Sequence, residues 1–598
     1  MLDYSDYMSK LPDNPHDNFA QLLEQVCRDH SEKDLILFRQ GGEKDFTRWT
    51  FSKYGEECRR IARGLLAAGL VKGDRVALWA ENRPQWMAVW MGAVIAGLRI
   101  VPIDFLSSEE ECRNIIKITR AKAFFYSGKK KEFAKKLETP FLACVCISPE
   151  EDGGGQAAVE YDSFGEKAQN QTLPPPDSIA PDEPASIVFT SGTTGFAKGV
   201  TLSHKGIISN VSAAIRLVEP NHTDVFIVVL PLHHTYSTTC AFLPPIFLGI
   251  PVVVCEKIIG KVIVDDIRDS GATFLVGVPL LFDKMMAAIG AKYNKLSPLV
   301  RLPLNLLRAK ALKEAQNGNF EFGQKAFRFL RKKAGLQSVR ITVSGGGPLK
   351  METADFFDSL GFNIVNGYGI SENSPIVCVN PPRFKRNASV GLMAVYTDVK
   401  ILSDDGEQAA AAVAGEGGLP ADALTGVGEI AIKSPSLMLG YFENEAATKE
   451  VFNDEGYLLT GDLGYRDKDG FLYIMGRKKN LIVSSSGKNI YPEEIEACFS
   501  GAPIISEILV VGKKSRTESG EQVFAVLVPN MEEVKAPPGA AADESFVRDL
   551  VKKEVEAVNR RLPTYKKISG FVLRSEPFEK NAQQKIKRFL YKDYEKPD

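Results

Sequence analysis

Short apolar runs and amphipathic segments alternate near the start of the chain. Apolar positions three and four residues apart predict helices over Asn18 to Cys27 and from Thr50 to Gly64. The runs Val76 to Trp79 and Ile100 to Ile103 are typical of buried strands, and a further helix begins within Glu81 to Trp86 between them. Strand–helix–strand alternation is typical of parallel α/β sheets. We therefore expect a large domain of doubly wound α/β sheets.

The pattern changes toward the end of the chain. It predicts strands over Ile505 to Val511 and Val523 to Val528, and a helix over Ser545 to Arg560. A chain of 598 residues is too long for one hydrophobic core. We expect an N-terminal domain over residues 1–478 that ends in a small β sub-barrel, and a small mobile α+β domain over residues 479–598. The Ala/Gly-rich segment Asp404 to Thr425 is interpreted as a surface excursion of the sub-barrel.

The most apolar stretch of the chain runs from Thr239 to Cys255. It contains Pro244, Pro245 and Pro251, and it is shorter than a membrane span requires. We interpret it as two buried strands, or as a strand and a helix.

Composition narrows the class of protein. There are 74 Lys and Arg against 75 Asp and Glu, so no excess of positive charge favours nucleic acid as a partner. The nine cysteines are scattered, and Cys144 and Cys146 lie in a strand-like run with one residue between them. That spacing indicates neither a zinc site nor a disulfide framework. The first residues carry no signal peptide pattern, so a cytoplasmic location is expected.

Residues 292–333 form a basic region with eleven Lys or Arg and two Glu. Leucines and phenylalanines recur in it at helical spacing, which predicts a pair of basic amphipathic helices. One interpretation is a solvated helical insertion packed on the sheet. The other is a peripheral membrane contact on the cytoplasmic face, in which each Lys or Arg near an anionic bilayer contributes about 1 kcal/mol.

A Ser/Thr/Gly-rich loop within Phe189 to His204 is the strongest candidate for chemistry. It follows the apolar run Ile187 to Phe189 and ends at Lys198. Backbone N–H groups and hydroxyls of such a loop can bind phosphate oxygens, and the lysine adds positive charge. The residues around Lys198 do not match a Walker loop. A flexible hairpin turn is the alternative interpretation.

This stretch resembles the phosphate loop of the adenylate-forming superfamily, which comprises acyl-CoA synthetases, peptide-synthetase adenylation domains and beetle luciferases. The resemblance implies that the loop cradles the pyrophosphate of ATP. The residues that would do so are Thr190, Ser191, Gly192, Thr193, Thr194, Gly195 and Lys198.

Two further segments are similar to the adenine-binding motifs of that superfamily. Ser344 to Leu349 matches S-G-G-x-P-L, and Asn366 to Glu372 matches x-G-Y-G-x-T-E with Ser371 in place of threonine. The resemblance implies that Tyr368 stacks on adenine and that Glu372, with Thr190, holds Mg²⁺. The remaining nucleotide-binding positions that it implies are Gly345, Gly346, Asn366, Gly367, Gly369 and Ser371.

The later motifs of the superfamily follow in the expected order. Asp462 and Arg477 match the ribose contacts, and Lys479 matches the hinge. Gly487 lies in a G-K-N-I-x-P-x-E-I-E segment that resembles the loop of acyl-CoA synthetases that meets coenzyme A. Lys585 aligns with the catalytic lysine in a K-I-x-R segment, although Asn581 and Gln584 depart from the family pattern before it.

The residues around His234 bear on the substrate. The segment Pro231 to His234 is similar to the family's P-x-x-H, which implies that His234 lies between the carboxylate-binding pocket and the thiol channel. An aspartate after this histidine would suit the ammonium group of an amino acid, and the chain has Thr235 instead. Gly277 to Leu281 resembles the acyl pocket of long-chain enzymes.

Together these motifs imply a ligase that uses ATP, Mg²⁺ and coenzyme A to convert a long-chain fatty acid to acyl-CoA through acyl-AMP. Its catalytic residues would be Lys198, His234, Glu372 and Lys585. One alternative is an acyl-AMP ligase that loads an acyl-carrier protein. A second is an inactive nucleotide-binding scaffold at a membrane, which the intact charged motifs disfavour.

Overall fold

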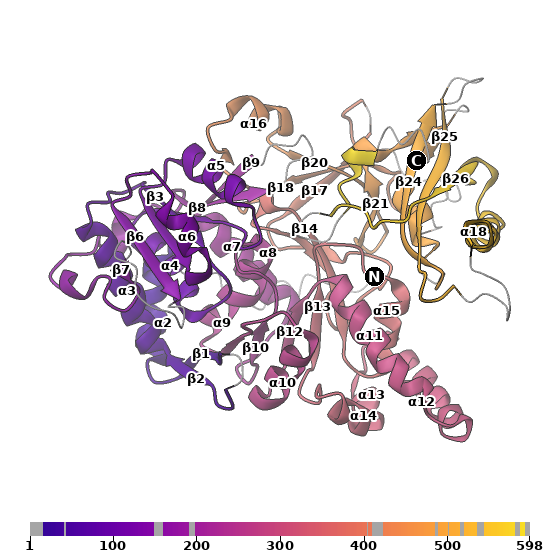
Figure 1. The fold of residues 1–598 in the computed structure, drawn as a ribbon, viewed down its shortest axis with the longest axis horizontal. Coiled ribbons are helices and arrows are strands. Elements are labelled where there is room, and N and C mark those ends of the chain that lie inside the picture. The colour runs from indigo at the N-terminus through magenta and orange to yellow at the C-terminus, as the bar shows by residue number, and fades with distance from the viewer. Residues whose placement is uncertain are drawn as a thin grey trace.

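The computed structural model describes most of the chain. The described residues are 16–40, 43–148, 159–190, 198–403, 405–409, 422–484, 488–499, 502–514, 520–534, 543–580 and 586–591. Within them the chain forms two large mixed sheets and three smaller ones, with helices on the faces of the large sheets (Figure 1). This mixed α/β architecture confirms the predicted fold class.

One large sheet has eight strands in the order β19-β9-β8-β4-β3-β5-β6-β7. Its strands are β3 (Arg75–Trp79), β4 (Arg99–Pro102), β5 (Ala123–Ser127), β6 (Ala143–Ser148), β7 (Val159–Glu160), β8 (Pro184–Thr190), β9 (Lys198–Ser203) and β19 (Gly440–Tyr441). β8 and β9 pair antiparallel, so the candidate phosphate loop joins the ends of a hairpin.

The other large sheet has nine strands in the order β16-β15-β14-β13-β12-β10-β11-β1-β2. Its strands are β1 (Asp34–Phe38), β2 (Thr47–Thr50), β10 (Phe226–Val228), β11 (Val252–Val254), β12 (Phe274–Gly277), β13 (Ile341–Ser344), β14 (Ile364–Gly369), β15 (Ile376–Val379) and β16 (Leu392–Met393). Strands β10 to β14 run parallel, which brings their carboxyl ends to one edge of the sheet.

Helices cover both large sheets. The described helices before residue 478 are α2 (Phe19–His30), α3 (Phe51–Ala67), α4 (Pro84–Ile95), α5 (Glu109–Thr119), α6 (Lys131–Lys135), α7 (His204–Val218), α8 (Thr235–Ser237), α9 (Leu243–Leu248), α10 (Gly260–Ser270), α11 (Pro279–Asn294), α12 (Pro298–Gln316), α13 (Glu321–Ala326), α14 (Arg328–Lys333), α15 (Met351–Ser359) and α16 (Glu445–Val451). α4 is apolar almost all round, and it packs on β3, β4, α2 and α3, which keep water from it. Of the two residues that could cap this helix, Thr50 and Ser52, Thr50 caps α3 by accepting from the Lys53 amide.

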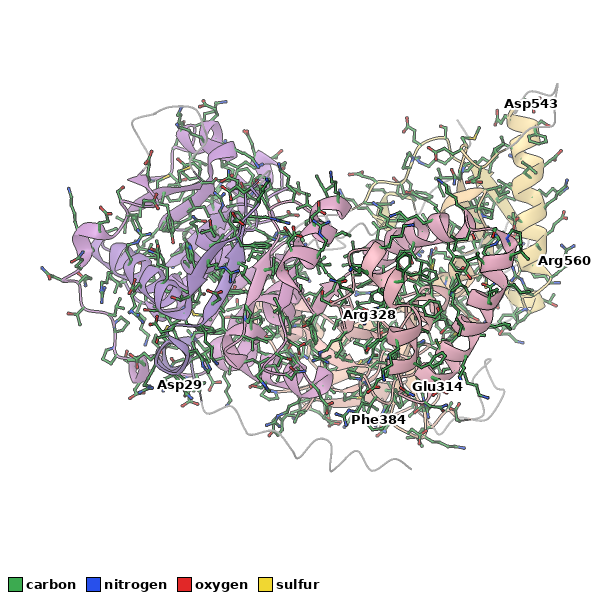
Figure 2. All side chains as sticks on the ribbon, turned by 90° about the horizontal axis from the view of Figure 1, so that it is seen from below. Asp29, Glu314, Arg328, Phe384, Asp543 and Arg560 are labelled. Atoms are coloured by element: carbon green, nitrogen blue, oxygen red, sulfur yellow. The ribbon has the colours of Figure 1, made fainter. Side chains whose placement is uncertain are left out.

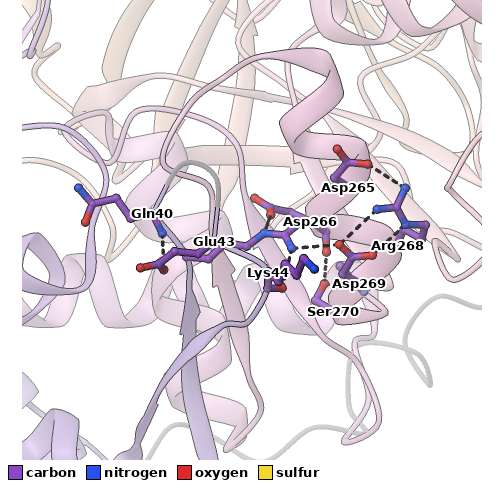
Figure 3. A network of polar contacts seen from close by, with 10 residues as sticks. Gln40, Glu43, Lys44, Asp265, Asp266, Arg268, Asp269 and Ser270 are labelled. Atoms are coloured by element: carbon purple, nitrogen blue, oxygen red, sulfur yellow. Dashed lines mark hydrogen bonds and ion pairs between the residues drawn. The ribbon is translucent and has the colours of Figure 1, made fainter.

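Polar contacts also join elements that are distant in sequence. The Arg39 guanidinium, just after β1, donates through Nε to Asp266 Oδ1 at 2.7 Å and through Nη1 to Asp269 Oδ2 at 3.0 Å. Figure 3 shows these two aspartates on α10 with Asp265, Arg268 and Ser270. This network fixes α10 against the end of β1.

The apolar stretch Thr239 to Cys255 is helical and then extended. A π-helical segment, Thr238–Phe242, leads into α9, and β11 follows. Of the two arrangements that its pattern allows, a helix and a strand is therefore correct. No helix among the described residues is long and apolar enough to cross a membrane.

The basic region 292–333 is helical, but its helices differ from the predicted pair. It contains the end of α11, the long helix α12 and the short helices α13 and α14. Figure 2 shows α12, which carries Glu314, on the outside of the molecule, and Arg328 at the start of α14. Three leucines of α12 spaced three and four residues apart, Leu299, Leu302 and Leu306, are 88%, 67% and 69% exposed.

A four-stranded antiparallel sheet stands where the sub-barrel is expected, in the order β17-β18-β20-β21. Its strands are β17 (Asp398–Leu402), β18 (Gly428–Lys433), β20 (Leu458–Arg466) and β21 (Leu472–Arg477). Most of the Ala/Gly-rich excursion, at 404 and 410–421, lies outside the described residues.

The C-terminal part has its own apolar core. Its elements are β22 (Ile482–Val483), β23 (Asn489–Ile490), α17 (Pro492–Ala497), β24 (Ile505–Lys514), β25 (Glu521–Pro529), α18 (Glu544–Asn559) and β26 (Gly570–Leu573). The strands at 505–514 and 521–529 and the helix agree with the sequence, which gave no sign of β26. Figure 2 shows α18 at one edge of the molecule, between its flanking residues Asp543 and Arg560.

Candidate active site

Asp462 is the centre of the first polar cluster. It lies opposite Arg477 in the pairing of β20 with β21, and Arg477 Nε is 2.6 Å from Asp462 Oδ1. The Tyr368 hydroxyl, on β14, donates to Asp462 Oδ2 at 2.6 Å. Asp462 is 4% exposed, so its charge is held in a low-dielectric position between these two donors. The structure thus brings together three residues from two different sheets that the sequence assigned to the nucleotide.

The Tyr368 hydroxyl is strongly held in this cluster. Burial, and then the Asp462 carboxylate, raise the pKa of Tyr368 well above its ordinary value. The tyrosine is therefore a neutral donor whose ring is fixed relative to the aspartate.

Asn366, within β14, and Ser344, at the end of β13, form a second cluster. They are direct partners in this parallel pair. The Asn366 amide donates to the Ser389 carbonyl at 3.1 Å, but Asn366 Oδ1 and Ser344 Oγ are buried and have no hydrogen-bond partner among the described residues. Leaving such groups unpaired is costly, so the pair suits a flat ligand with complementary polar atoms, such as adenine.

The glycines Gly345 and Gly346 follow β13 directly. A Cβ on Gly345 would lie 2.7 Å from the Tyr236 ring, whose hydroxyl donates to the Gly277 carbonyl at 3.1 Å. The glycine at position 345 is therefore required by the packing of Tyr236, a reason that differs from the approach of a ligand. The positions Gly367 and Gly369 lie on β14, beside Tyr368, and Ser371 begins the 3₁₀ turn that carries Glu372.

Glu372 belongs to a third cluster, whose key contact is Tyr441. The Tyr441 hydroxyl donates to Glu372 Oε1 at 2.9 Å, and Lys198 Nζ lies 4.7 Å from the centre of the Tyr441 ring. β19 places Tyr441 beside β9, which starts at Lys198. Burial, and then Glu372, raise the pKa of Tyr441, so it is a neutral donor to the carboxylate. Tyr441 thus connects two residues that the sequence assigned to catalysis.

Sequence reasoning gave Tyr441 no role, because its contact with Glu372, 69 positions away, depends on the fold.

The structure describes only the two ends of the candidate phosphate loop. Thr190 ends β8 and pairs with Lys198 at the start of β9, with Thr190 Oγ1 3.5 Å from the Lys198 carbonyl oxygen. The predicted residues Ser191, Gly192, Thr193, Thr194 and Gly195 lie outside the described residues. Carboxylate and hydroxyl oxygens such as those of Glu372 and Thr190 are the donor type that Mg²⁺ prefers.

His234 lies in the turn after β10, and Asn82 fixes that turn. The Asn82 side chain donates to the Leu230 carbonyl and accepts from the Leu232 amide, both at 2.8 Å. Burial lowers the pKa of His234 to about 4, so the imidazole is neutral at pH 7. Asn82 thus positions the histidine turn, a role that the sequence pattern did not indicate.

Thr235 links this turn to the Glu372 segment. The hydroxyl oxygens of Thr235 and Ser371 are 3.5 Å apart.

The remaining predicted residues lie on the C-terminal side. Lys479 is exposed in a 3₁₀ turn, Lys478–Asn480, and the neighbouring Asn480 side chain donates to Glu493 at 2.8 Å. Gly487 and Lys585 lie outside the described residues, so their placement stays a prediction. Arg588, three positions after Lys585, donates to the Val510 carbonyl at 3.1 Å, which anchors the K-I-x-R segment to β24.

An open groove of about 990 Å³ lies between α11, α12 and α15. Its lining residues include Met286, Tyr293, Arg308 and Phe356. None of the predicted site residues is among the residues that line it.

Comparison with known proteins identifies relatives along nearly the whole chain. A family model described as AMP-binding enzyme matches residues 23–442, and one for the AMP-binding enzyme C-terminal domain matches residues 479–596. The long-chain-fatty-acid–CoA ligase ACSBG2 of Gallus gallus is 28% identical over 551 residues, which cover 86% of this chain and 69% of that protein.

Other relatives carry different names. The 2-succinylbenzoate–CoA ligase of Bacillus licheniformis is 29% identical, with 93% of this chain and 96% of that protein covered. The chloroplastic long-chain-fatty-acid–acyl-carrier-protein ligase AEE15 of Arabidopsis thaliana is 25% identical, with 85% and 75% covered.

Solved structures share the fold. The anthranilate CoA ligase AuaEII in complex with anthranoyl-AMP has a TM-score of 0.75 at 18% identity, with 98% of each chain covered. The o-succinylbenzoate coenzyme A synthetase of Bacillus subtilis with ATP and magnesium has a TM-score of 0.69 at 22% identity, with 95% of this chain and 98% of that chain covered. Because the first family model spans more than half of the residues, the chain belongs to the AMP-binding enzymes of the adenylate-forming superfamily.

Proposed function

We propose that this protein is an AMP-forming acid–thiol ligase that activates a long-chain fatty acid with ATP and transfers the acyl group to coenzyme A. The observation that carries the proposal is the pair of clusters around Asp462 and Glu372. They provide a fixed carboxylate suited to two ribose hydroxyls and a second carboxylate suited to Mg²⁺. The names of several relatives point to the same class of reaction.

In the first half-reaction the carboxylate of the acid attacks the α-phosphate of ATP, and pyrophosphate leaves. Both reactants are anionic, so the site has to supply positive charge and hold the two in line. We assign Asp462 and Arg477 to the ribose, and Tyr368 with Asn366 to the adenine. Lys198 and the loop after Thr190 would hold the leaving pyrophosphate. Mg²⁺, when bound at Glu372 and Thr190, would neutralise phosphate oxygens.

The acid is assigned to the side of the site at His234. The residue after His234 is Thr235, where an aspartate would suit the ammonium group of an amino acid, so an acid without an ammonium group is favoured. The length of the acid is supported by the names of relatives that act on long-chain fatty acids. The 2-succinylbenzoate enzyme among the relatives makes a short aromatic acid the competing substrate.

In the second half-reaction a thiol attacks the acyl-adenylate and AMP leaves. We assign Lys585 to the first half-reaction and the Gly487 loop to the second. Both lie in the C-terminal domain that we place at residues 479–598, so the two steps require that domain to rotate about Lys479.

We also propose a peripheral membrane contact through α12. Its exposed leucines at 299, 302 and 306 lie on one face, because residues three and four apart are neighbours on a helix. Lys310 and Lys313 on the same helix are exposed as well. An apolar row beside lysines suits the interface of an anionic membrane, where the free fatty acid is dissolved.

The test is acid-dependent release of pyrophosphate by the purified protein with ATP and Mg²⁺. Acids from acetate to stearate, 2-succinylbenzoate and benzoate are compared with and without coenzyme A. We expect turnover with coenzyme A that is greatest for long acids. Turnover that peaks on an aromatic acid would contradict the long-chain assignment, and no release with any acid would contradict the ligase.

A second candidate is an acyl-AMP ligase that loads an acyl-carrier protein. The similarity to the acyl-carrier-protein ligase AEE15 favours it. The same assay separates the two, because this candidate predicts that acyl-AMP accumulates with coenzyme A and is consumed when a holo acyl-carrier protein is added.

A further inference from the structure

Two histidines and an aspartate converge beside the turn that follows β10. Asp104 comes shortly after β4, in the eight-stranded sheet, whereas His233 and His234 follow β10, in the nine-stranded sheet. One potential ligand atom of each residue lies within 4.8 Å of those of the other two. Because Asn82 holds the β10 turn at both Leu230 and Leu232, the histidine backbone is positioned independently of any ligand.

His233 has a buried nitrogen that nothing described satisfies. The residue is 7% exposed, and its Nε2 has no hydrogen-bond partner among the described residues. Asp104 Oδ1 is 3.5 Å from this nitrogen, and the His234 ring centre is 3.9 Å from that of His233. A buried imidazole nitrogen without a partner is costly, so its retention here calls for a ligand.

Asp104 is held so that its carboxylate faces the histidines. Its main-chain carbonyl accepts from the Trp79 indole at 2.7 Å, and its Oδ1 accepts from the Leu106 amide at 2.9 Å. The carboxylate is therefore anchored through its backbone and one amide, which leaves it able to take a cation.

Two imidazoles and a carboxylate are the ligand set of a transition-metal site. Zn²⁺ takes nitrogen and oxygen ligands at about 2.1 Å in a tetrahedron, so two ligands on one ion are about 3.4 Å apart. The 3.5 Å between His233 Nε2 and Asp104 Oδ1 already matches this separation. The widest separation in the cluster, at most 4.8 Å, requires a contraction of about 1.4 Å, which side-chain rotation can supply.

We propose that Asp104, His233 and His234 form a binding site for a divalent transition-metal ion of the Zn²⁺ type. This site differs from the Mg²⁺ site assigned to Glu372 in its ligands, because imidazole ligands select borderline ions over Mg²⁺. The ion has three protein ligands and one open coordination position.

A consequence follows that rests on the proposed function. His234 lies where we assign the acid, so a bound ion withdraws its imidazole from that side of the site. Zn²⁺ therefore inhibits adenylation by the full chain, and the inhibition is relieved by a chelator that leaves Mg²⁺ in place.

The test of the site uses Co²⁺ as a spectroscopic substitute for Zn²⁺ in the full-length protein. The visible absorption of bound Co²⁺ is titrated in the presence of excess Mg²⁺, and Zn²⁺ is then added in competition. The variants are His233→Gln and Asp104→Asn, and His222→Gln is the matched control, because His222 is an exposed histidine that precedes β10, whereas the histidines of the cluster follow β10. We expect one tetrahedral Co²⁺ per chain, displaced by Zn²⁺. Each of the two cluster variants should weaken binding at least about 10-fold, because loss of even an outer-shell partner has an effect of that size.

The melting temperature is a second measurement, which distinguishes loss of metal binding from poor folding of a variant. Zn²⁺ should raise the melting temperature of the wild type and of His222→Gln but not of the cluster variants, since only binding to the native state stabilises it. Co²⁺ binding that is equal in the wild type and in His233→Gln would overturn the proposal, as would an octahedral spectrum that Mg²⁺ abolishes. A normal tetrahedral spectrum in a protein that activates no acid would support the metal site and refute the proposed ligase.

Discussion

The Arg588 guanidinium contacts the Glu496 carboxylate, which joins two segments that lie 92 residues apart. Arg588 ends the K-I-x-R segment that contains Lys585, and Glu496 lies in the helix of the G-K-N-I-x-P-x-E-I-E segment. Glu496 Oε1 also accepts from the Val510 amide at 2.7 Å, and Arg588 donates to the Val510 carbonyl. The segments that we assign to the two half-reactions are therefore fastened to the same point on β24.

This junction makes the stability of the C-terminal part depend on pH. Burial raises the pKa of Glu496 to about 7, against the opposing effect of Arg588, whereas an unfolded glutamate titrates near 4.3. Between these values the folded state binds more protons than the unfolded state. The stabilisation that Glu496 contributes to the folded state is thus complete below about pH 4.3. It is lost as the pH rises through about 7, at up to about 1.4 kcal/mol per pH unit.

We expect Glu496→Gln to abolish this part of the pH dependence. Urea unfolding of the full chain, followed by signals from the C-terminal part, would be measured at several pH values between about 5 and 8. The free energy of unfolding of the wild type should fall relative to that of the variant as the pH rises. Glu532→Gln, at an exposed glutamate, is the control and should follow the wild type. Parallel curves for the wild type and Glu496→Gln would show that Glu496 is already ionised at low pH.

The Asp462 cluster predicts a specific loss of nucleotide affinity. Asp462→Asn removes the charge that Arg477 and Tyr368 contact, and hydrogen bonds to charged groups contribute about 1.5–3 kcal/mol each. Binding of ATP, measured by calorimetry, should weaken at least about 10-fold.

The ribose assignment is tested by combining this variant with 2′-deoxy-ATP. The wild type should bind the deoxy nucleotide more weakly than ATP, and Asp462→Asn should hardly distinguish the two, because the same contact cannot be lost twice. Additive losses would mean that Asp462 acts without touching the 2′-hydroxyl.

The Tyr441–Glu372 contact predicts a changed requirement for magnesium. Tyr441→Phe removes the hydroxyl that orients Glu372 and keeps the ring beneath Lys198. Loss of such an outer-shell partner typically weakens a metal site about 10–100-fold, so the Mg²⁺ concentration for half-maximal pyrophosphate release should rise by that factor.

The comparison with Tyr441→Leu separates the two contacts of this side chain. The leucine variant should show the same shift in Mg²⁺ requirement and, in addition, a higher KM for ATP, since the aromatic partner of Lys198 is gone. An unchanged Mg²⁺ titration in both variants would contradict the ligand role of Glu372.

How far the sequence predicts this protein depends on the kind of interaction. The sheets, the capped helix α3 and the order of the motifs follow from local patterns and family resemblance, both of which the chain carries in contiguous segments. The contacts of Asp462 with Tyr368 and of Tyr441 with Glu372 join residues 94 and 69 positions apart, and no local pattern reports such a contact.

The sequence also did not reveal the packing roles of Asn82 and Gly345. Asn82 appeared to be an ordinary residue before a helix, because its partners Leu230 and Leu232 are reached only through the fold. Gly345 suggested the approach of a ligand, whereas the atom nearest to its missing Cβ belongs to Tyr236. In both cases the residue type indicated that something approaches closely, and the identity of the neighbour required the structure.

Lys585→Ala tests the division of labour in the C-terminal domain. The lysine is assigned to the transition state of adenylation, so the variant should lose formation of acyl-AMP and keep much of the transfer from preformed acyl-AMP to coenzyme A. Both half-reactions are followed separately by release of pyrophosphate and of AMP. Lys587→Ala is the matched control, because Lys587 is paired with Glu579 at 2.8 Å and should change neither. Equal losses in the two half-reactions would contradict the role that we assign to Lys585.

The exposed face of α12 predicts binding to anionic vesicles. Removing a leucine side chain from a membrane interface forfeits about 1.5–3 kcal/mol, so Leu302→Glu and Leu306→Glu should each weaken co-sedimentation with phosphatidylserine-containing vesicles at least about 10-fold. Val71→Glu is the control, since Val71 is 61% exposed but lies outside α12, between α3 and β3. Added salt should weaken the binding of the wild type, because lysines contribute through screened charges. A wild-type chain that stays in the supernatant at low salt would refute the membrane contact and leave the helices of residues 292–333 as a solvated insertion on the sheet.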